Sequence, residues 1–147
     1  MSAVIAVIDT NVVVAGLLTG RIDSPTALVL EGMLTRRFAF LLSFPLVAEY
    51  RSVLLRPAIA GRHGLGSEEV DHLLTDIVAN GKLIEPGTLD GESPPDAADR
   101  HLWELLAARS EAVLVTGDRL LIESHPSWTR VVSPAAFTVM MGWLRQP

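Results

Sequence analysis

The sequence predicts one α/β domain, spanning residues 1–147, in which helices cover both faces of a parallel sheet. Short apolar segments rich in Val, Ile and Leu alternate along the chain with longer segments whose apolar residues recur at helical spacing. The short segments do not alternate polar with apolar residues, which is typical of strands buried on both faces. A length of 147 residues is sufficient for one domain with a sizeable core.

The chain is expected to open with a buried strand followed by two helices. Residues 3–8 read AVIAVI and form the strand, and a short helix follows from about Asn11. The mostly polar stretch 19–24 predicts a loop. Because Pro25 suits the first turn of a helix, we expect a helix over residues 25–37.

A second strand and two further helices are expected next. Residues 38–43 read FAFLLS and form another short apolar strand. Apolar residues share one face of a helix over 45–55, which stops before Pro57. The glycine-containing stretch 60–66 predicts a flexible loop, and an amphipathic helix is expected over 67–80.

The second half of the chain continues the alternation of strands and helices. Residues 82–86 are expected to form a short strand, and the turn-forming residues of 87–95 form the clearest loop in the chain. A helix over 96–110 and a buried strand over 112–116 come next. The remaining expected elements are a short helix after Gly117 and Asp118, a strand over 129–133 and a helix over 134–144.

Composition excludes several functional classes. The chain has no cysteine, which removes disulfides, thiol nucleophiles and zinc–cysteine sites and fits a reducing cytoplasm. Apolar runs fall short of the roughly 20 residues that span a bilayer, and the start lacks the pattern of a signal peptide, so we expect a cytoplasmic protein without a membrane partner. The net charge of −5 argues against a broad basic face for nucleic acid. Apart from Lys82 the basic residues are arginines, a bias that suits phosphate contacts but also follows from a GC-rich genome.

Acidic residues recur where the expected strands end. In open parallel sheets, ligands bind beyond the carboxyl ends of the strands. Asp9 follows the first strand, Asp118 follows the strand over 112–116, and Asp96 and Asp99 open the helix after the long loop. Each of these residues also suits the N-terminus of a helix, so capping is an alternative explanation for each one alone.

Two of the acids lie on helix faces that are otherwise apolar. Glu49 shares a face with Leu46 and Val53, and Asp99 leads into the apolar face of its own helix. A carboxylate in such a place costs free energy unless it is paired or bound to a cation. Two unit charges about 4 Å apart repel by roughly 4 kcal/mol at an effective dielectric near 20. A divalent cation such as Mg²⁺ or Mn²⁺ relieves this repulsion and allows an acidic site to receive a phosphodiester.

Three other phosphate-handling sites each lack a required feature. Phosphatases with an aspartyl nucleophile need a second Asp two residues after the first, where this chain has Asn11 after Asp9. A phosphoacceptor signalling domain needs an acidic pair near its first strand and a late lysine, and Lys82 is the only lysine. The sequence GRHGLG neither follows a strand nor opens a helix, as a nucleotide-binding loop requires.

Five segments in a fixed order resemble one known family. They read VIDTNVVVAGLL, LLSFPLVAEYRSVLLRP, PPDAADRHLWELLAA, AVLVTGDRLLI and RVVSPAAF, and they span nearly the whole chain. The family is that of the PIN-domain ribonucleases, in particular a bacterial and archaeal branch of toxins from toxin–antitoxin pairs. The resemblance implies a three-layer α/β/α sandwich with a central, mainly parallel sheet. It also implies cleavage of RNA by an acidic cluster that binds Mg²⁺ or Mn²⁺.

The resemblance assigns roles to individual residues. The acids implied as catalytic and metal-binding are Asp9, Glu49, Asp99 and Asp118, with Asp96 as a flanking metal ligand. The side chains implied to orient these carboxylates are Thr10, Asn11, Ser43 and Thr116. For Ser43 and Thr116, satisfying the backbone at a strand end is an equal alternative. Arg100 and Arg119 adjoin the cluster and are candidates for contacting RNA phosphate, with a solvated or ion-paired arginine as the alternative. His101 is expected to occupy an exposed helix position.

Partners follow from the same branch, whose toxins often form dimers and are inhibited by an antitoxin protein. We therefore expect an RNA substrate, an antitoxin and a homodimer. Trp128 and the stretch 140–143 are candidates for an exposed apolar surface, although residues at this spacing are more often part of a core. One departure concerns the motif TGDRLLI, which lacks the second acid that this branch often carries after Asp118. The alternative function is therefore a PIN fold that binds RNA or protein without cutting.

Overall fold

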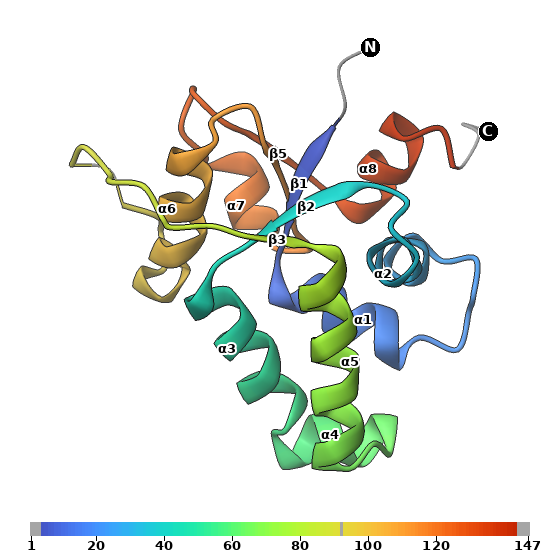
Figure 1. Cartoon of the computed structure of the whole chain (residues 1–147). Helices are drawn as coiled ribbons and strands as arrows, with labels where there is room; N and C mark the ends of the chain where they lie inside the picture. The colour runs from blue at the N-terminus through green and yellow to red at the C-terminus, as the bar shows by residue number, and fades with distance from the viewer. Residues whose placement is uncertain (1–3, 92, 144–147) are drawn as a thin grey trace.

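A central parallel sheet organises the computed structural model, which describes residues 4–91 and 93–143. The sheet has five strands in the order β3-β2-β1-β4-β5, and neighbouring strands are parallel throughout (Figure 1). The strands are β1 (Ile5–Ile8), β2 (Ala39–Leu42), β3 (Lys82–Leu83), β4 (Val113–Val115) and β5 (Arg130–Val132). The α/β prediction is confirmed. Residue 3, the expected start of the first strand, lies outside the described residues.

Helices lie on both sides of this sheet. They are α1 (Thr10–Leu18), α2 (Pro25–Leu34), α3 (Phe44–Leu54), α4 (Pro57–His63), α5 (Ser67–Asn80), the 3-10 helix η1 (Ala97–Asp99), α6 (Arg100–Ala108), α7 (Arg119–Glu123) and α8 (Pro134–Met140). In Figure 1, α6 and α7 lie on one side of the sheet, and α2 and α8 lie on the other. The result is the three-layer α/β/α arrangement that the sequence analysis expected.

The strand order creates a switch point beside β1. From β1 the chain extends the sheet in one direction through β2 and β3, and later in the other direction through β4 and β5. The backbone N–H of Asp9 donates to the carbonyl of Val115 at 2.9 Å, so the pairing of β1 and β4 continues one residue past β1. In open α/β sheets, ligands bind at such a point, outside the carboxyl ends of the strands.

The core fixes the helices against this central strand. Ala6, Val7 and Ile8 of β1 are fully buried. Tyr50 of α3 is also fully buried, and its hydroxyl donates a hydrogen bond to the carbonyl of Ile8. Because a buried hydroxyl and a buried carbonyl each need a partner, this bond stabilises one packing of α3 on β1. The position of α3 in turn fixes Glu49, the residue before Tyr50.

The apolar residues considered as an exposed surface pack against the core and stay partly exposed. Trp128, Met140, Met141 and Trp143 are half-buried and pack against it. Trp143 also lies beside Phe38 and Phe137, with ring centroids 5.6 and 5.7 Å away. Their partial burial supports the alternative that they pack against the core, and a role for them in a dimer stays a prediction.

The expected flexible loop over residues 60–66 was wrong, because helix α4 runs through its first part to His63. Pro57 occupies the first turn, where its missing N–H costs nothing, and Gly64 ends the helix with a left-handed φ of 73°. The ring of His63 bonds to the carbonyl of Leu54 at 2.8 Å and to the N–H of Leu65 at 2.9 Å. These terminal contacts offset the weak helix propensity of Gly61.

Other element bounds differ less from expectation. The helix expected over 96–110 begins as the 3-10 turn η1 and ends at Ala108, and the helix expected over 25–37 ends at Leu34. Of the stretch expected as a strand over 82–86, only Lys82 and Leu83 form β3, although the N–H of Ile84 also donates to the carbonyl of Leu42 at 2.9 Å. The helix expected over 134–144 ends at Met140, and residue 144 lies outside the described residues. Such differences arise because frayed ends are decided by hydrogen bonds rather than by composition.

The glycines of α4 provide a test of this helix. A Cβ on Gly61 meets nothing within 4 Å, so Gly61→Ala is expected to raise the free energy of unfolding by about 0.5–1 kcal/mol. Gly64 has equally open surroundings but a left-handed φ, so Gly64→Ala is expected to lower it by about 1 kcal/mol. Urea denaturation measures both. Equal effects of the two substitutions would indicate that residues 60–64 are a loop.

Candidate active site

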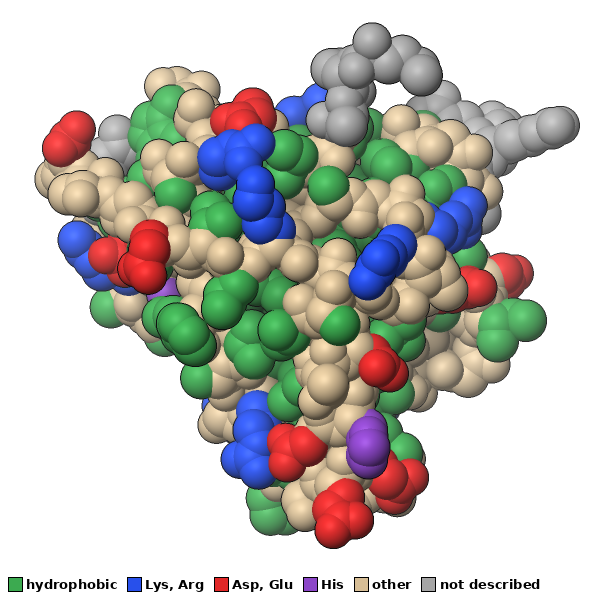
Figure 2. Space-filling view, viewed as in Figure 1, with side chains coloured by type: hydrophobic (Ala, Val, Ile, Leu, Met, Phe, Trp, Pro, Cys, Tyr) green, Lys and Arg blue, Asp and Glu red, His purple; other side chains and the backbone are tan. Residues whose placement is uncertain are grey.

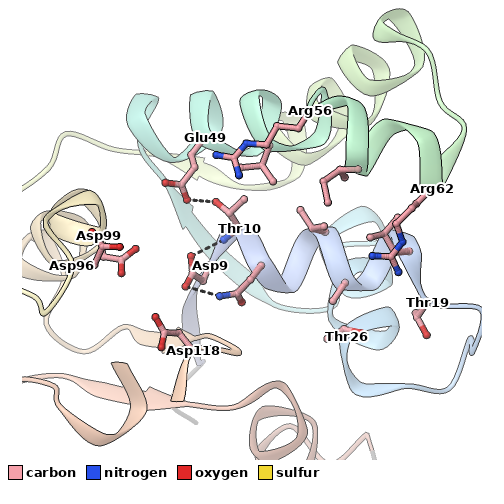
Figure 3. A pocket seen from close by; sticks show the side chains of 16 residues that line it. Asp9, Thr10, Thr19, Thr26, Glu49, Arg56, Arg62, Asp96, Asp99 and Asp118 are labelled. Carbon is pink, nitrogen blue, oxygen red and sulfur yellow. Dashed lines mark hydrogen bonds between the residues drawn. The ribbon is translucent and has the colours of Figure 1, made fainter. Parts of the chain in front are cut away.

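Five carboxylates from four parts of the chain meet at the switch point. They line one cavity of about 760 Å³ beside the carboxyl end of β1. Figure 3 shows the acids around a common opening, and they are Asp9, Glu49, Asp96, Asp99 and Asp118. Asp9 stands between β1 and α1, Glu49 on α3, Asp96 and Asp99 at η1, and Asp118 before α7. The fold therefore brings together all five acids that the sequence analysis singled out.

Asp9 is the buried centre of this group. Its side chain caps α1, because Oδ1 accepts the N–H of Thr10 at 2.8 Å. Oδ2 accepts the hydroxyl of Thr116 at 2.7 Å and the amide of Asn11 at 3.2 Å. Burial raises the pKa of Asp9 above its usual value, although the donors from Thr116 and Thr10 favour the charged form. Asp9 therefore both caps α1 and belongs to the acidic site.

Asn11 and Thr116 join the turn after β1 to the turn after β4. The amide oxygen of Asn11 accepts the N–H of Gly117 at 2.9 Å, and the hydroxyl of Thr116 accepts the N–H of Asp118 at 3.0 Å. Both residues also donate to Asp9, so the two turns share one hydrogen-bond network. This network fixes Asp9 and Asp118 relative to each other.

Ser43 does not take part in that network. It is fully buried, and its hydroxyl accepts the N–H of Leu46 at 3.3 Å as the N-cap of α3. It does not line the acidic cavity. Ser43 therefore satisfies a backbone N–H at the start of α3, which is the alternative role considered for it. It affects the site only by helping to position α3.

Glu49 is held by two donors from other elements. The hydroxyl of Thr10 donates to Oε1, and Nε2 of His101 lies 3.1 Å from Oε2. The hydrogen bond with His101 lowers the pKa of Glu49 most, against the opposing effect of burial. The carboxylate of Glu49 is therefore ionised at neutral pH and is turned in one direction by its partners.

His101 was expected to occupy an exposed position, and this was wrong. Its side chain is only 15% exposed, and Nδ1 is buried with no hydrogen-bond partner in the described part of the chain. Burial lowers the pKa of His101, but the hydrogen bond and charge of Glu49 outweigh it, so that the pKa is raised. Only the packing of α6 beside α3 brings these residues together, since no local spacing relates them.

Asp99 is the least satisfied of the acids. Its half-buried carboxylate accepts no hydrogen bond from residues 4–91 or 93–143. Burial, followed by the charges of Asp9, Asp96, Asp118 and Glu49, raises the pKa of Asp99 to about 6. A group of facing carboxylates with free oxygens has the donor chemistry that hard divalent cations prefer.

The acids have the chemistry to bind a cation, but they do not form a complete metal-binding group. Among the described residues, no three acidic or histidine side chains are already gathered as a metal-binding group. Asp96 and Asp118 each use one oxygen to cap a short helix, accepting the N–H of Ala98 and of Leu120 at 2.9 Å. Each carboxylate keeps a second oxygen free of such a bond, so a cation and its water shell are compatible with the capping contacts.

The arginines on the cavity are not those expected from the sequence. Arg100 and Arg119 do not line it, and each lies near a glutamate of its own helix, at 3.9 Å and 3.7 Å. Arg56 and Arg62 line it instead. Sequence reasoning missed Arg62 because residues 60–66 were expected to form a loop, and it missed Arg56 because this residue lies between the helices α3 and α4.

Comparison with known proteins gives one match. A family model described as PIN domain matches residues 5–120, a span that contains all five acids. The chain matches no curated protein and no solved structure. Within the described residues, none of the helices combines the length and the apolar composition that crossing a membrane requires.

The pKa of Asp99 predicts a stability effect. Because the folded pKa of about 6 exceeds the usual value of 3.8, ionisation of Asp99 destabilises the fold as pH rises through 6. Asp99→Asn is expected to stabilise the metal-free protein at pH 7 by about 1 kcal/mol after solvent screening, which raises Tm by about 3 °C. The difference should vanish near pH 4.

Thermal unfolding followed by circular dichroism measures this effect in the presence of a chelator. Asp76→Asn, at an exposed position of α5 away from the cavity, serves as the matched control and should leave Tm unchanged at both pH values. Destabilisation by Asp99→Asn at pH 7 would contradict the repulsion described here.

Proposed function

This chain belongs to the PIN-domain family, and from that premise we propose that it is a Mg²⁺- or Mn²⁺-dependent endoribonuclease. PIN domains are generally nucleases that usually use divalent metal ions, so a nuclease-type function and nucleic-acid binding follow from the family. RNA as substrate, internal cleavage and these ions are the proposal. The observation that supports it is the convergence of five carboxylates on one cavity, where Asp99 accepts no hydrogen bond from any described residue.

The cation would be held by the acids that line the cavity. Asp9, Asp99 and Asp118 would bind it directly or through water, with Asp96 at the edge of the site. Glu49 would bind it or orient a water. When bound, Mg²⁺ or Mn²⁺ would neutralise charge developing on the phosphate and lower the pKa of an attacking water. Without a cation these carboxylates would repel a phosphodiester.

The surrounding residues contribute orientation and charge. Thr10, Asn11 and Thr116 donate to Asp9 or Glu49 and so limit the rotation of both carboxylates. Because His101 and Thr10 hold Glu49 in its ionised form, Glu49 can accept a hydrogen bond from water at neutral pH. A site held in this way loses little freedom when the substrate binds.

We extend the proposal to a biological role as the toxin of a toxin–antitoxin pair that acts in the cytoplasm as a homodimer. This step rests on the ordered motifs of the sequence. The alternative remains a PIN fold that binds RNA or protein without cutting. The observation that favours the alternative is Leu120, which stands two residues after Asp118, at the position where this branch often carries a second acid.

Cleavage of RNA tests the main proposal. Purified protein with Mg²⁺ or Mn²⁺ is expected to cut a circular single-stranded RNA, which only internal cleavage opens. Chelation, Asp9→Asn or Asp99→Asn should each reduce the rate by more than about hundredfold, because each weakens cation binding. Gel electrophoresis of labelled RNA measures the rate, and Asp76→Asn is the control.

Two outcomes would count against this function. Cleavage that survives chelation or both substitutions would exclude the metal-dependent nuclease. If the protein binds Mn²⁺ and RNA but leaves circular and linear RNA intact, the non-cutting alternative is favoured.

The contact between His101 and Glu49 predicts a second kinetic effect. His101→Ala removes a donor from Glu49 and is expected to lower kcat about tenfold with KM within twofold, since an orienting contact rather than a substrate contact is lost. His101→Gln, which keeps a donor, should recover much of the rate. Steady-state kinetics measures both variants, and an equal loss for Ala and Gln would argue against an orienting role.

A further inference from the structure

The acidic cavity continues along α1 to a basic end. Asp9 caps the start of α1 and Thr19 caps its end, and both residues line the same cavity. The nine residues of α1 rise about 1.5 Å each, so the cavity extends for roughly 14 Å. Figure 3 shows the acids at one end of the helix and Arg62, with Thr19 and Thr26, at the other.

The middle of this cavity is apolar and contains no aromatic side chain. Its lining there consists of Val14, Ala15, Leu18, Val53 and Ile59. Such a surface accommodates sugars and bases better than phosphates. Since stacking on aromatic rings is absent from the lining, binding here depends on charge at the ends of the cavity.

The cavity contains arginines without partners. Seven described arginines have a hydrogen bond, an ion pair or a ring contact, namely Arg21, Arg36, Arg37, Arg51, Arg100, Arg109 and Arg119. Within residues 4–91 and 93–143, Arg56, Arg62 and Arg130 have no such contact. Two of these three line the cavity.

The guanidinium groups of Arg56 and Arg62 are notable because the protein as a whole is acidic. On the face drawn in Figure 2, basic and acidic side chains are interspersed rather than gathered into a basic surface. The net charge of the chain is −5. An unpaired arginine beside an apolar trough provides a forked donor that matches a phosphate. Arg56 also lies close enough to Glu49 to lower the pKa of that carboxyl, so its positive charge acts on the acidic end of the cavity.

We propose that Arg56 and Arg62 are positioning residues that hold the backbone of a single RNA strand lying along α1. This inference rests on the proposed function and states how the substrate is held. The cleaved phosphate lies at the acids, and a phosphate near the far end of α1 contacts Arg62. At a rise of about 3.4 Å per stacked nucleotide, roughly four nucleotides bridge the two ends. Arg56 contacts the strand between them.

Binding of a length series tests this arrangement. The probes are fluorescent oligouridylates of two to ten nucleotides with phosphorothioate linkages, checked by gel for integrity after each measurement with Mg²⁺. Affinity is expected to rise with length until about four or five nucleotides. Arg62→Ala should weaken binding of the longer probes about tenfold and leave the dinucleotide unchanged. Each arginine removed should reduce the slope of log affinity against log salt by about 0.7.

Arg130→Ala provides the matched control. Arg130 is also an exposed arginine without a partner in the described residues, but it begins β5, at the amino end of the sheet. Its removal should change neither affinity nor salt slope. With a cleavable eight-nucleotide RNA, Arg62→Ala should raise KM with little change in kcat, because the contact is remote from the bond that is cut.

Defined results overturn the inference. It fails if Arg56→Ala and Arg62→Ala bind every length as wild type does, if Arg100→Ala or Arg119→Ala causes the loss instead, or if no oligonucleotide binds. Its failure is distinguishable from that of the nuclease proposal. Arginine-dependent binding without cleavage would overturn the nuclease alone, whereas normal cleavage by Arg62→Ala at every length would overturn the arginine contact alone.

Discussion

The buried carboxylate of Asp9 is the constraint on which the rest of the site depends. It stands one residue past the central strand, caps α1 and accepts donors from Thr116 and Asn11. Those two residues also bond to the turn that carries Asp118. A single charged group therefore ends the strand, starts the helix and joins the two loops at the switch point. Its low exposure of 5% makes each donor necessary, since a buried charge without donors is costly.

The second constraint is repulsion among the acids. Burial, followed by the charges of the four other carboxylates, raises the pKa of Asp99 to about 6. This arrangement does not serve stability, because the protein would be more stable with a neutral residue at this position. A bound cation would explain the cost, because carboxylates that repel one another bind a cation more tightly. Glu49 does not carry this cost, because its carboxylate accepts hydrogen bonds from His101 and Thr10.

The third constraint is the length of α1, which separates the acids from the basic end of the cavity. Helix α4 determines that basic end, because Arg56 precedes its first turn and Arg62 lies in its last. A polynucleotide needs contacts at more than one phosphate to be held in register, and an acidic protein has few free cations to supply them. In the proposed arrangement, Arg56 and Arg62, which line the cavity, supply these contacts.

The sequence by itself determined the class of fold and the identity of the acids. Strand burial depends on local apolar runs, and strand ends in a parallel sheet converge on one edge, so Asp9 and Asp118 could be predicted to meet. Only the tertiary structure decided which hydrogen-bond donors and which basic side chains lie near these acids. His101 contacts Glu49 although the two residues are 52 positions apart in the sequence. Arg62 belongs to helix α4, where the sequence predicted a loop. Local patterns record the periodicity of each element, but contacts between elements depend on how their faces pack, which spacing along the chain does not encode.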